Sequence, residues 1–367
     1  MAWTADKVPL PELVEAPDEI DQKAHQLAEL TGQSKHFIVF TGAGVSTSAG
    51  IPDFRGPDGA WTLQAQGRQR TTAAVSTLQA IPTATHMALV ELQNPGLLKY
   101  LVSQNCDGLH RRSGILPDKI SELHGNNNRE ICKDCGKEYI RDFHAELALA
   151  YDHAKKADLC LVLGSSLTVS PANDIPEVVG KRRRQRGGAK LAICNLQATP
   201  LDAMADLRVH AKTDELMVKV MRKLGMGIPG FALQRRLSVH VEAAGERRAG
   251  IGKVIVSGVD VDGTPVSFLR SVKLVNNQQV LKTEPFEFDV RGLGGGLELK
   301  MELEFMGHYG EPNLEVVHLV QEAEIGIPVV YVLEYNPSNG ERKAGRQYTT
   351  HMVAHSHEYR GGVPCLV

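Results

Sequence analysis

Four short apolar segments of this chain each end in glycines or in amide and hydroxyl side chains, which are groups that hold phosphates and sugars. The junctions are Thr41-Gly42-Ala43-Gly44-Val45-Ser46 after residues 36–40, Gln104-Asn105-Cys106-Asp107-Gly108 after 100–103, Gly164-Ser165-Ser166 after 159–163, and Asn195-Leu196-Gln197 after 191–194. Glycines let a backbone approach a pyrophosphate, and a following helix N-terminus offers free N–H groups and partial positive charge. These junctions predict a nucleotide site.

The first junction is a weak signal when it is taken alone. Gly42 and Gly44 begin a dinucleotide fingerprint, but Thr47 stands where the third glycine is expected. A tight strand-to-helix turn explains the two glycines equally well. Four such junctions in succession are harder to explain as turns, so a nucleotide site is the favoured interpretation.

Two further segments carry groups that suit a reaction on a bound ligand. Residues 50–56 join a rigid turn to the ring of Phe54 and the guanidinium of Arg55, as expected of a loop that covers a ligand. His124 is a candidate general base, because imidazole accepts a proton near neutral pH. A single histidine is more often structural than catalytic, so the sequence position alone leaves both roles open.

Cys132 and Cys135 form a Cys-x-x-Cys pair, which can give two thiolates to one zinc ion. A closed structural zinc site needs four ligands, and no second pair follows in the sequence. His144 or a second molecule could complete the shell, but we expect incomplete occupancy. Because a structural zinc contributes folding free energy, its loss should leave this small module loose.

The apolar segments have the length and continuity of strands that are buried on both faces. Helix-compatible stretches such as 85–98 separate them over residues 36–223, which predicts a parallel sheet covered by helices. A short helix is also expected at 20–30, within an N-terminal extension of residues 1–35. Because parallel strands share one carboxyl edge, the four junctions should meet there.

The pattern changes after a Gly- and Pro-rich stretch, and residues 224–235 are predicted to be a linker. Beyond it, apolar and charged residues alternate, as at 297–305, with the period of a strand that has one buried face. Asp262-Gly263 and Asn339-Gly340 are hairpin turn signals. Residues 236–350 are therefore predicted to form an antiparallel β-sandwich-like domain, followed by a tail at 351–367.

Length and composition agree with this division. A chain of 367 residues favours two domains, and a net charge of −2 predicts no global attraction to nucleic acid or anionic lipid. The start shows no secretory signal, and no apolar run approaches the roughly 20 residues that span a bilayer. We expect reduced cysteines, no membrane partner, and a cytosolic or nuclear setting.

In their order along the chain, these motifs resemble the signatures of the sirtuins, which are NAD-dependent protein deacylases. The matching segments are 42–46, 50–55, 104–110, Leu123-His124-Gly125, 164–167 and 195–197, over about residues 30–222. Pro57-x-Gly59-x-Trp61-Thr62 and Thr85-His86-Met87 resemble the nuclear, class IV branch. The resemblance implies an α/β fold: a Rossmann-like parallel sheet with helices on both faces and a small zinc module.

The resemblance also implies an activity, in which the acyl group of a protein lysine passes to the ADP-ribose of NAD and nicotinamide is released. His124 would take a proton from a ribose hydroxyl, with Asn105 and Asp107 as further catalytic residues. The implied NAD-binding residues are Gly42, Ala43, Gly44, Thr47, Phe54, Arg55, Trp61, Gln104, Gly164, Ser165, Asn195, Gln197 and Thr213. Acylated proteins, histones among them, are the implied substrates, and the nucleus is the implied location, with the cytoplasm as the alternative.

The chain departs from the family pattern after Cys135. Family members carry a second Cys-x-x-Cys and then a strand and an acidic loop beside the acyl-lysine tunnel. Here residues 139–143 lead almost directly into 145–151, which looks like the helix before strand 159–163. The zinc module, about 125–145, is therefore predicted to be truncated. Because the NAD half is intact, an NAD- or ADP-ribose-binding or chromatin-associated variant without turnover is the alternative to an active deacylase.

Residues 181–186 form a basic cluster, Lys-Arg-Arg-Arg-Gln-Arg. A solvated loop between a helix and a strand is the simpler interpretation. The alternatives are a nuclear-localisation signal or a contact with DNA or chromatin, since basic clusters bind phosphates in a salt-sensitive way. A DNA-binding structural protein is thus a third hypothesis, which predicts binding that weakens with salt and ignores NAD.

Overall fold

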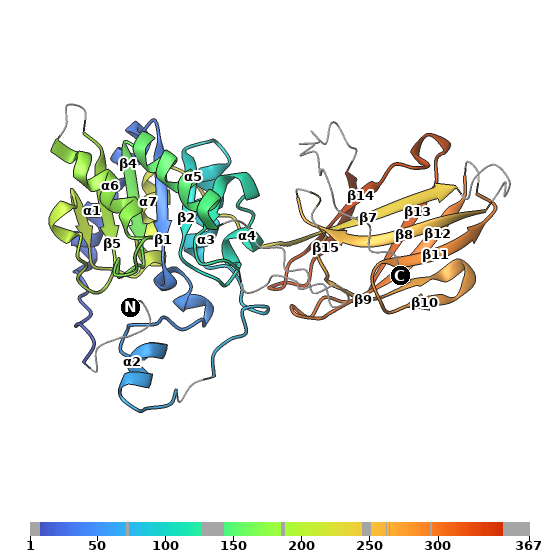
Figure 1. Cartoon of the computed structure of the whole chain (residues 1–367), viewed down its shortest axis with the longest axis horizontal. Coiled ribbons are helices and arrows are strands. Elements are labelled where there is room, and N and C mark those ends of the chain that lie inside the picture. Colours follow the sequence, from blue (N-terminus) through green and yellow to red (C-terminus); the bar gives the residue numbers. More distant parts are fainter. Residues whose placement is uncertain are drawn as a thin grey trace. The chain divides into compact units, whose positions relative to one another are not determined.

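The structure of the chain, a computed structural model, describes residues 8–70, 73–126, 143–184, 188–243, 251–261, 263, 265–293 and 296–347. These residues form two compact units, each of which is seen in Figure 1. A parallel-sheet unit ends at Phe231 and a β-rich unit begins at Ala232, within the stretch predicted to be a linker. In the described part of the chain, every helix is too short or too polar to span a membrane.

The described residues of the first unit contain a six-stranded parallel sheet with the order β3-β2-β1-β4-β5-β6. Its strands are β1 (Phe37–Thr41), β2 (Leu98–Ser103), β3 (Ile120–Glu122), β4 (Leu159–Leu163), β5 (Lys190–Cys194) and β6 (Leu207–Val209). The strand sequence reverses between β1 and β4, which is where a crevice opens at the carboxyl edge of such sheets. The predicted Rossmann-like sheet is confirmed.

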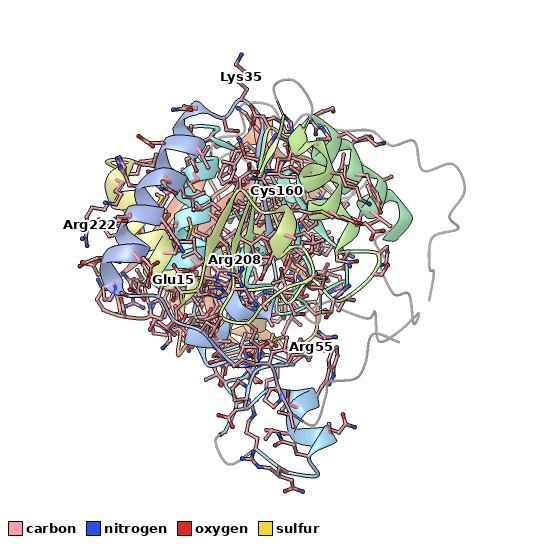
Figure 2. All side chains as sticks on the ribbon, turned by 90° about the vertical axis from the view of Figure 1, so that its left-hand side faces the viewer. Glu15, Lys35, Arg55, Cys160, Arg208 and Arg222 are labelled. Carbon is pink, nitrogen blue, oxygen red and sulfur yellow. The ribbon has the colours of Figure 1, made fainter. Side chains whose placement is uncertain are left out.

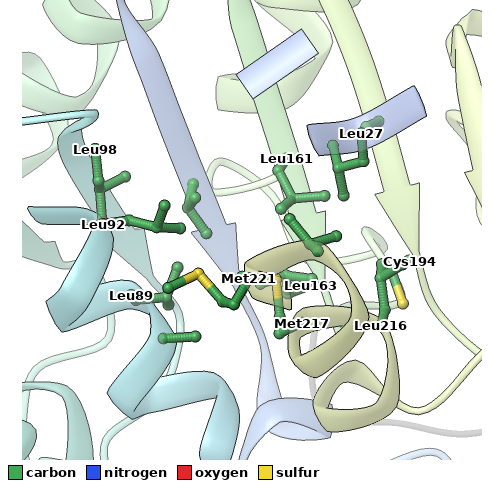
Figure 3. Close-up of a cluster of buried hydrophobic side chains, with 14 of the residues drawn as sticks. Leu27, Leu89, Leu92, Leu98, Leu161, Leu163, Cys194, Leu216, Met217 and Met221 are labelled. Carbon is green, nitrogen blue, oxygen red and sulfur yellow. The ribbon is translucent and has the colours of Figure 1, made fainter. Parts of the chain in front are cut away.

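Helices cover both faces of this sheet (Figure 1). The helices α1 (Pro17–Gln33), α3 (Ala84–Gln93) and α7 (Thr213–Lys223) pack on one face, and α5 (Phe143–Lys156) and α6 (Asp174–Lys181) on the other. In β1, Phe37 and Val39 belong to the first core, and Ile38 and Phe40 to the second. Figure 3 shows the first core, where side chains of α1, α3 and α7 meet the sheet.

Several elements differ from the sequence-based expectation. The helix expected at 20–30 extends over all of α1, and the one expected at 85–98 ends at Gln93. β3 and β6 were not predicted, because each is three residues long and includes polar residues. After β1 the chain enters two 3-10 turns, Ala43–Val45 and Thr47–Ala49, instead of an α-helix.

The β-rich unit contains two antiparallel sheets whose apolar faces share one core, as predicted for a sandwich. Their orders are β10-β9-β12-β13 and β11-β8-β7-β14-β15. The strands are β7 (Leu233–Ala243), β8 (Ile251–Val259), β9 (Leu269–Leu274), β10 (Gln279–Leu281), β11 (Phe286–Arg291), β12 (Glu298–Phe305), β13 (Leu314–Leu319), β14 (Val329–Tyr335) and β15 (Arg342–Gln347). In β12 the expected alternation holds, with Leu299, Met301 and Leu303 buried.

The loop at the Asn339-Gly340 hairpin signal is longer than the two-residue turn that the signal predicts. Pairing of β14 with β15 stops at Tyr335 and Arg342, and Asn336 N donates to Glu341 O (2.8 Å) across the loop. In this loop Gly340 has a positive φ of 75°, whereas Asn339 does not. Near the other signal Gly263 has a φ of 83°, and Asp262 lies outside the described residues.

Candidate active site

A cavity of about 790 Å³ lies at the carboxyl edge of the parallel sheet, a size typical of small-molecule sites. Residues that follow β1, β2, β3, β4 and β5 line it, together with the start of α7. The structure brings every predicted catalytic and NAD-binding residue to this cavity: Gly42, Ala43, Gly44, Thr47, Phe54, Arg55, Trp61, Gln104, Asn105, Asp107, His124, Gly164, Ser165, Asn195, Gln197 and Thr213.

The glycines after β1 allow two loops of the protein to touch. A Cβ atom on Gly44 would lie 2.7 Å from Gly164 Cα, and one on Gly42 would lie 2.7 Å from Gly164 O. Gly44 N donates to Gly164 O (2.9 Å), and Gly164 has a φ of 61°. This packing gives Gly42 and Gly44 a structural role, and their predicted contact with a pyrophosphate stays a prediction. The 3-10 turns that follow also replace the expected helix N-terminus.

Asn105 and Asp107 hold the loop after β1 from the side of β2. Asn105 Nδ2 donates to Gly42 O (3.0 Å), and Ser46 Oγ donates to Asp107 Oδ2 (2.7 Å). The other carboxylate oxygen of Asp107 accepts from Leu109 N (2.9 Å) at the start of the short helix α4 (Leu109–Ser113). Both side chains are buried. Supporting this loop accounts for their positions, and their predicted catalytic role stays a prediction.

His124 follows β3 and is exposed at the cavity. The protein around its ring partly excludes water and lowers the pKa of His124, while a hydrogen bond with the backbone of Gln104 works in the opposite direction. The imidazole is therefore neutral at pH 7 and able to accept a proton. Cys106 Sγ donates to the carbonyl oxygen of His124 (3.2 Å) and fixes the turn that carries it.

Gln104 offers a hydrogen-bond donor to a ligand in the cavity. Its Oε1 accepts from Ser165 Oγ (3.0 Å), whereas its Nε2 is buried and has no partner among the described residues. Burying a donor without a partner costs about 1–3 kcal/mol. An acceptor on a bound molecule would remove this cost, and NAD carries suitable oxygens on its nicotinamide and ribose groups.

The loop 50–62 gives the cavity an aromatic wall. The ring centroids of Phe54 and Trp61 are 4.7 Å apart, and Arg55 Cζ lies 4.4 Å from the centroid of the Trp61 ring. The short helix α2 (Ala60–Ala65) carries Trp61. This wall joins flat apolar surface to one guanidinium, a combination that suits a nucleotide.

Asn195, Gln197 and Thr213 line the cavity beyond β5 and β6. Arg208 in β6 donates to Asn195 O (2.9 Å) and to Gln197 O (2.7 Å), so that one guanidinium shapes the turn after β5. Thr213 is the first residue of α7, and its Oγ1 accepts from Thr85 Oγ1 (3.2 Å). The last contact gives Thr213 a structural reason for being buried.

Several lining residues were not predicted from the sequence, among them Glu12, Ser48, Cys106, Lys212 and Asp214. Asp214 accepts from Thr85 N (2.8 Å) and from Ser48 Oγ (2.5 Å), so it links α7 to α3 and to the turn after β1. Cys106 belongs to the motif at 104–108 that was recognised in the sequence, but it was not assigned a role there. The others belong to segments without a recognisable pattern.

Two buried histidines lie next to the end of β1 and the loop that follows it. His110 Nε2 and Thr41 Oγ1 are 2.9 Å apart, and His86 caps α3 together with Thr83, whose Oγ1 donates to Val45 O (3.0 Å). The two imidazole centroids are 4.5 Å apart. Burial lowers the pKa of His86 to about 3 and that of His110 well below its usual value. Both rings are therefore neutral and structural at pH 7.

The proposed zinc half-site, Cys132 and Cys135, lies outside the described residues. Within the described ranges no group of three or more His, Cys, Asp or Glu side chains could hold a metal ion. Burial raises the pKa of Cys160, and it raises the pKa of Cys194 to about 12. These two thiols are protonated, so neither is a suitable metal ligand.

The described part of the basic cluster makes contacts within the first unit. The pairs are Lys181 with Glu177 (2.8 Å), Arg182 with the carbonyl of Ala154 (2.9 Å), and Arg183 with Asp206 (3.0 Å). Lys181 ends α6, and residues 182–184 form a 3-10 turn, so this part is not the loop expected from the sequence. Residues 185 and 186 lie outside the described residues. These contacts favour a solvated surface over a DNA site.

Comparison with known proteins identifies the family. The Sir2 family model matches residues 65–147. The chain is 37% identical over 320 residues to the NAD-dependent protein deacetylase SRT1 of Oryza sativa subsp. indica, covering 76% of this chain and 65% of that protein. It is 43% identical over 244 residues to SRT1 of Arabidopsis thaliana (57% and 50%), and 35% identical over 264 residues to Sirt6 of Drosophila melanogaster (60% and 81%). The chain belongs to the Sir2 family, the sirtuins.

The extent of these alignments is also informative. The chain spans 65% and 50% of the length of the two plant relatives. The rice alignment takes in 76% of the 367 residues of this chain, which is about 279, so it extends past Phe231 into the β-rich unit. Sequence similarity is therefore not confined to the parallel-sheet unit.

Proposed function

We propose that this chain is an NAD-dependent protein-lysine deacylase, which transfers the acyl group of a protein lysine to ADP-ribose and releases nicotinamide. The observation that carries the proposal is a single cavity in which the predicted NAD-binding residues surround His124. Relatives named NAD-dependent protein deacetylase support it. The amide nitrogen of Gln104, which has no hydrogen-bond partner in the described part of the chain, fits a polar ligand at the same point.

The dinucleotide is proposed to lie across the switch point of the sheet. His124 after β3 and Gln104 after β2 mark the reactive end, where the nicotinamide ribose would be bound. The adenosine half then extends in the other direction, past β4, to the ends of β5 and β6. The phosphates would lie between these ends, near Ser165 and Arg55, which line the same cavity.

The proposed role of His124 is to take a proton from a hydroxyl of the nicotinamide ribose. The hydroxyl oxygen becomes a better nucleophile for the acyl carbon as it loses this proton. A neutral ring is required, and the lowered pKa of His124 provides it at pH 7. Asn105 and Asp107 would keep the loop after β1 in the arrangement that the ligand needs.

Product analysis tests this function on the full chain. Incubation with an acetylated peptide and NAD should yield nicotinamide and O-acetyl-ADP-ribose together, measured by mass spectrometry. If both products are absent while calorimetry still detects ADP-ribose binding, the deacylase proposal is wrong. The chain would then be the alternative, a nucleotide-binding sirtuin variant without turnover.

We infer that the zinc module is truncated. The alignment with the fruit-fly relative has 264 positions, but it includes only 60% of this 367-residue chain, which is about 220 residues. The remaining positions are gaps in this chain, which supports a segment in the relative that has no counterpart here. Two thiolates, Cys132 and Cys135, do not close a tetrahedral zinc shell. Mass spectrometry of the purified metal-replete chain should therefore find well below one zinc per chain. One zinc per monomer would contradict the inference and indicate replacement ligands such as His144.

A nuclear location, histone substrates and a chromatin contact are finer proposals that rest on the resemblance to the class IV branch. The contacts of Lys181, Arg182 and Arg183 within the first unit weigh against a DNA contact through residues 181–183. Recognition of chromatin would then depend on other surfaces.

A further inference from the structure

A segment before α1 borders one end of the cavity through Glu12. Three hydrogen bonds tie it to the parallel sheet: from Leu13 N to Leu196 O (2.9 Å), from Gln197 Nε2 to Leu10 O (2.8 Å), and from Glu15 N to His210 O (2.9 Å). Figure 2 labels Glu15, at the end of this segment. Residues 10–15 are thus fixed against the turns that follow β5 and β6.

Glu12 lies between two of these hydrogen bonds and lines the cavity. Burial raises the pKa of Glu12, and the negative charges of Asp53 and Asp58 raise it further, while Lys212 works in the opposite direction. These groups therefore act on the same end of the cavity. The Glu12 carboxylate lines the cavity at this end, so it repels a second negative charge placed beside it.

The resemblance assigns the side-chain amides of Asn195 and Gln197 to the adenosine half, and the nitrogen of each donates a hydrogen bond within the protein. Asn195 Nδ2 donates to Gln197 O (2.9 Å), and Gln197 Nε2 donates to Leu10 O (2.8 Å). Within the described part of the chain, by contrast, no group donates a hydrogen bond to the Glu12 carboxylate. Glu12 therefore offers this end of the cavity a charged acceptor that the described residues leave unused.

The proposed function places the nicotinamide ribose at His124. The adenosine ribose of the same ligand would then lie at the end of the cavity that Glu12 lines. NAD has a hydroxyl at the 2′ position of this ribose, and NADP has a phosphate there. A carboxylate accepts a hydrogen bond from the hydroxyl but repels the phosphate. We propose that Glu12 determines cofactor specificity by accepting a hydrogen bond from the adenosine ribose and excluding dinucleotides that carry a 2′-phosphate.

Calorimetry on the full chain with ADP-ribose and with 2′-phospho-ADP-ribose tests this inference without requiring turnover. The wild-type chain should prefer ADP-ribose. Glu12→Lys should shift the ratio of the two affinities toward the phosphorylated ligand by about tenfold or more, because it replaces a repulsive charge by an attractive one. Glu12→Gln should shift the ratio in the same direction by a smaller factor.

Glu19→Lys is the matched control, since it makes the same change of charge at an exposed position of α1. It should leave the affinity ratio unchanged. An unchanged ratio in Glu12→Lys, with ADP-ribose still bound, would overturn this inference and leave the proposed function intact. An equal shift in Glu19→Lys would also overturn it, because the effect would then be one of net charge. If the wild-type chain binds neither ligand, the proposed function fails and this inference fails with it.

Discussion

Replacing His124 by alanine is expected to lower the rate of O-acetyl-ADP-ribose formation by about 10²–10⁴-fold, the usual contribution of a general base. The affinity for ADP-ribose should stay close to that of the wild type, because the lining residues beyond β4, β5 and β6 are unchanged. The rate is measured by mass spectrometry and the affinity by calorimetry. His25→Ala, at an exposed position of α1, is the control and should keep full activity.

The pH dependence gives a second measurement of the same group. The pKa of His124 is lowered, so the neutral, proton-accepting ring persists below pH 6.5 and is lost only as the pH falls through the lowered pKa. The acid-side fall of kcat/KM should therefore lie below pH 6.5, and His124→Ala should lack it. A variant that retains turnover, or an unchanged acid limb, would remove His124 from the base role.

Gly44→Ala is expected to destabilise the parallel-sheet unit by about 1–3 kcal/mol, as overpacking of a closely packed site does. The added Cβ would lie 2.7 Å from Gly164 Cα, and because the contact is with backbone, no side-chain rotation relieves it. The two loops must separate, so nucleotide affinity should fall as well. Both tryptophans of the chain precede residue 62, so their fluorescence during urea unfolding follows this unit.

Gly32→Ala is the matched control for this experiment. Gly32 lies in α1, and a Cβ atom there would have no neighbour within 4 Å among the described residues. In a helix, alanine is more favourable than glycine by about 0.5–1 kcal/mol, so this variant should be as stable as the wild type or more stable. Equal urea midpoints for Gly44→Ala and Gly32→Ala would contradict the packing role of Gly44.

The sequence was sufficient to predict the layout of the sheet edge, because continuous apolar strands and their polar ends are local features. The junctions after β1, β2, β4 and β5 meet at one cavity, as expected from a parallel sheet. The packing of Gly42 and Gly44 against Gly164 was not predictable. That contact depends on how closely two loops approach, and sequence spacing does not report that distance.

The N-terminal segment could not be predicted for a related reason. Residues 8–16 contain no helical or alternating period, and their hydrogen bonds join Leu10 to a residue 187 positions away. Such a contact leaves no local trace in the sequence. β3 and β6 were missed because a strand of three residues, such as Ile120–Glu122, is too short to establish a period. Tertiary pairing, not local preference, selects their conformation.

The place of β3 in the sheet has a consequence for how this lineage can diversify. Among the described strands β3 pairs only with β2, from Leu101–Ile120 to Ser103–Glu122, and α5 then leads into the central strand β4. The registers of the described strands do not depend on the length of the connection between β3 and α5. Insertions or deletions there can therefore change the connection between β3 and α5 while the pairing of the described parallel strands is retained.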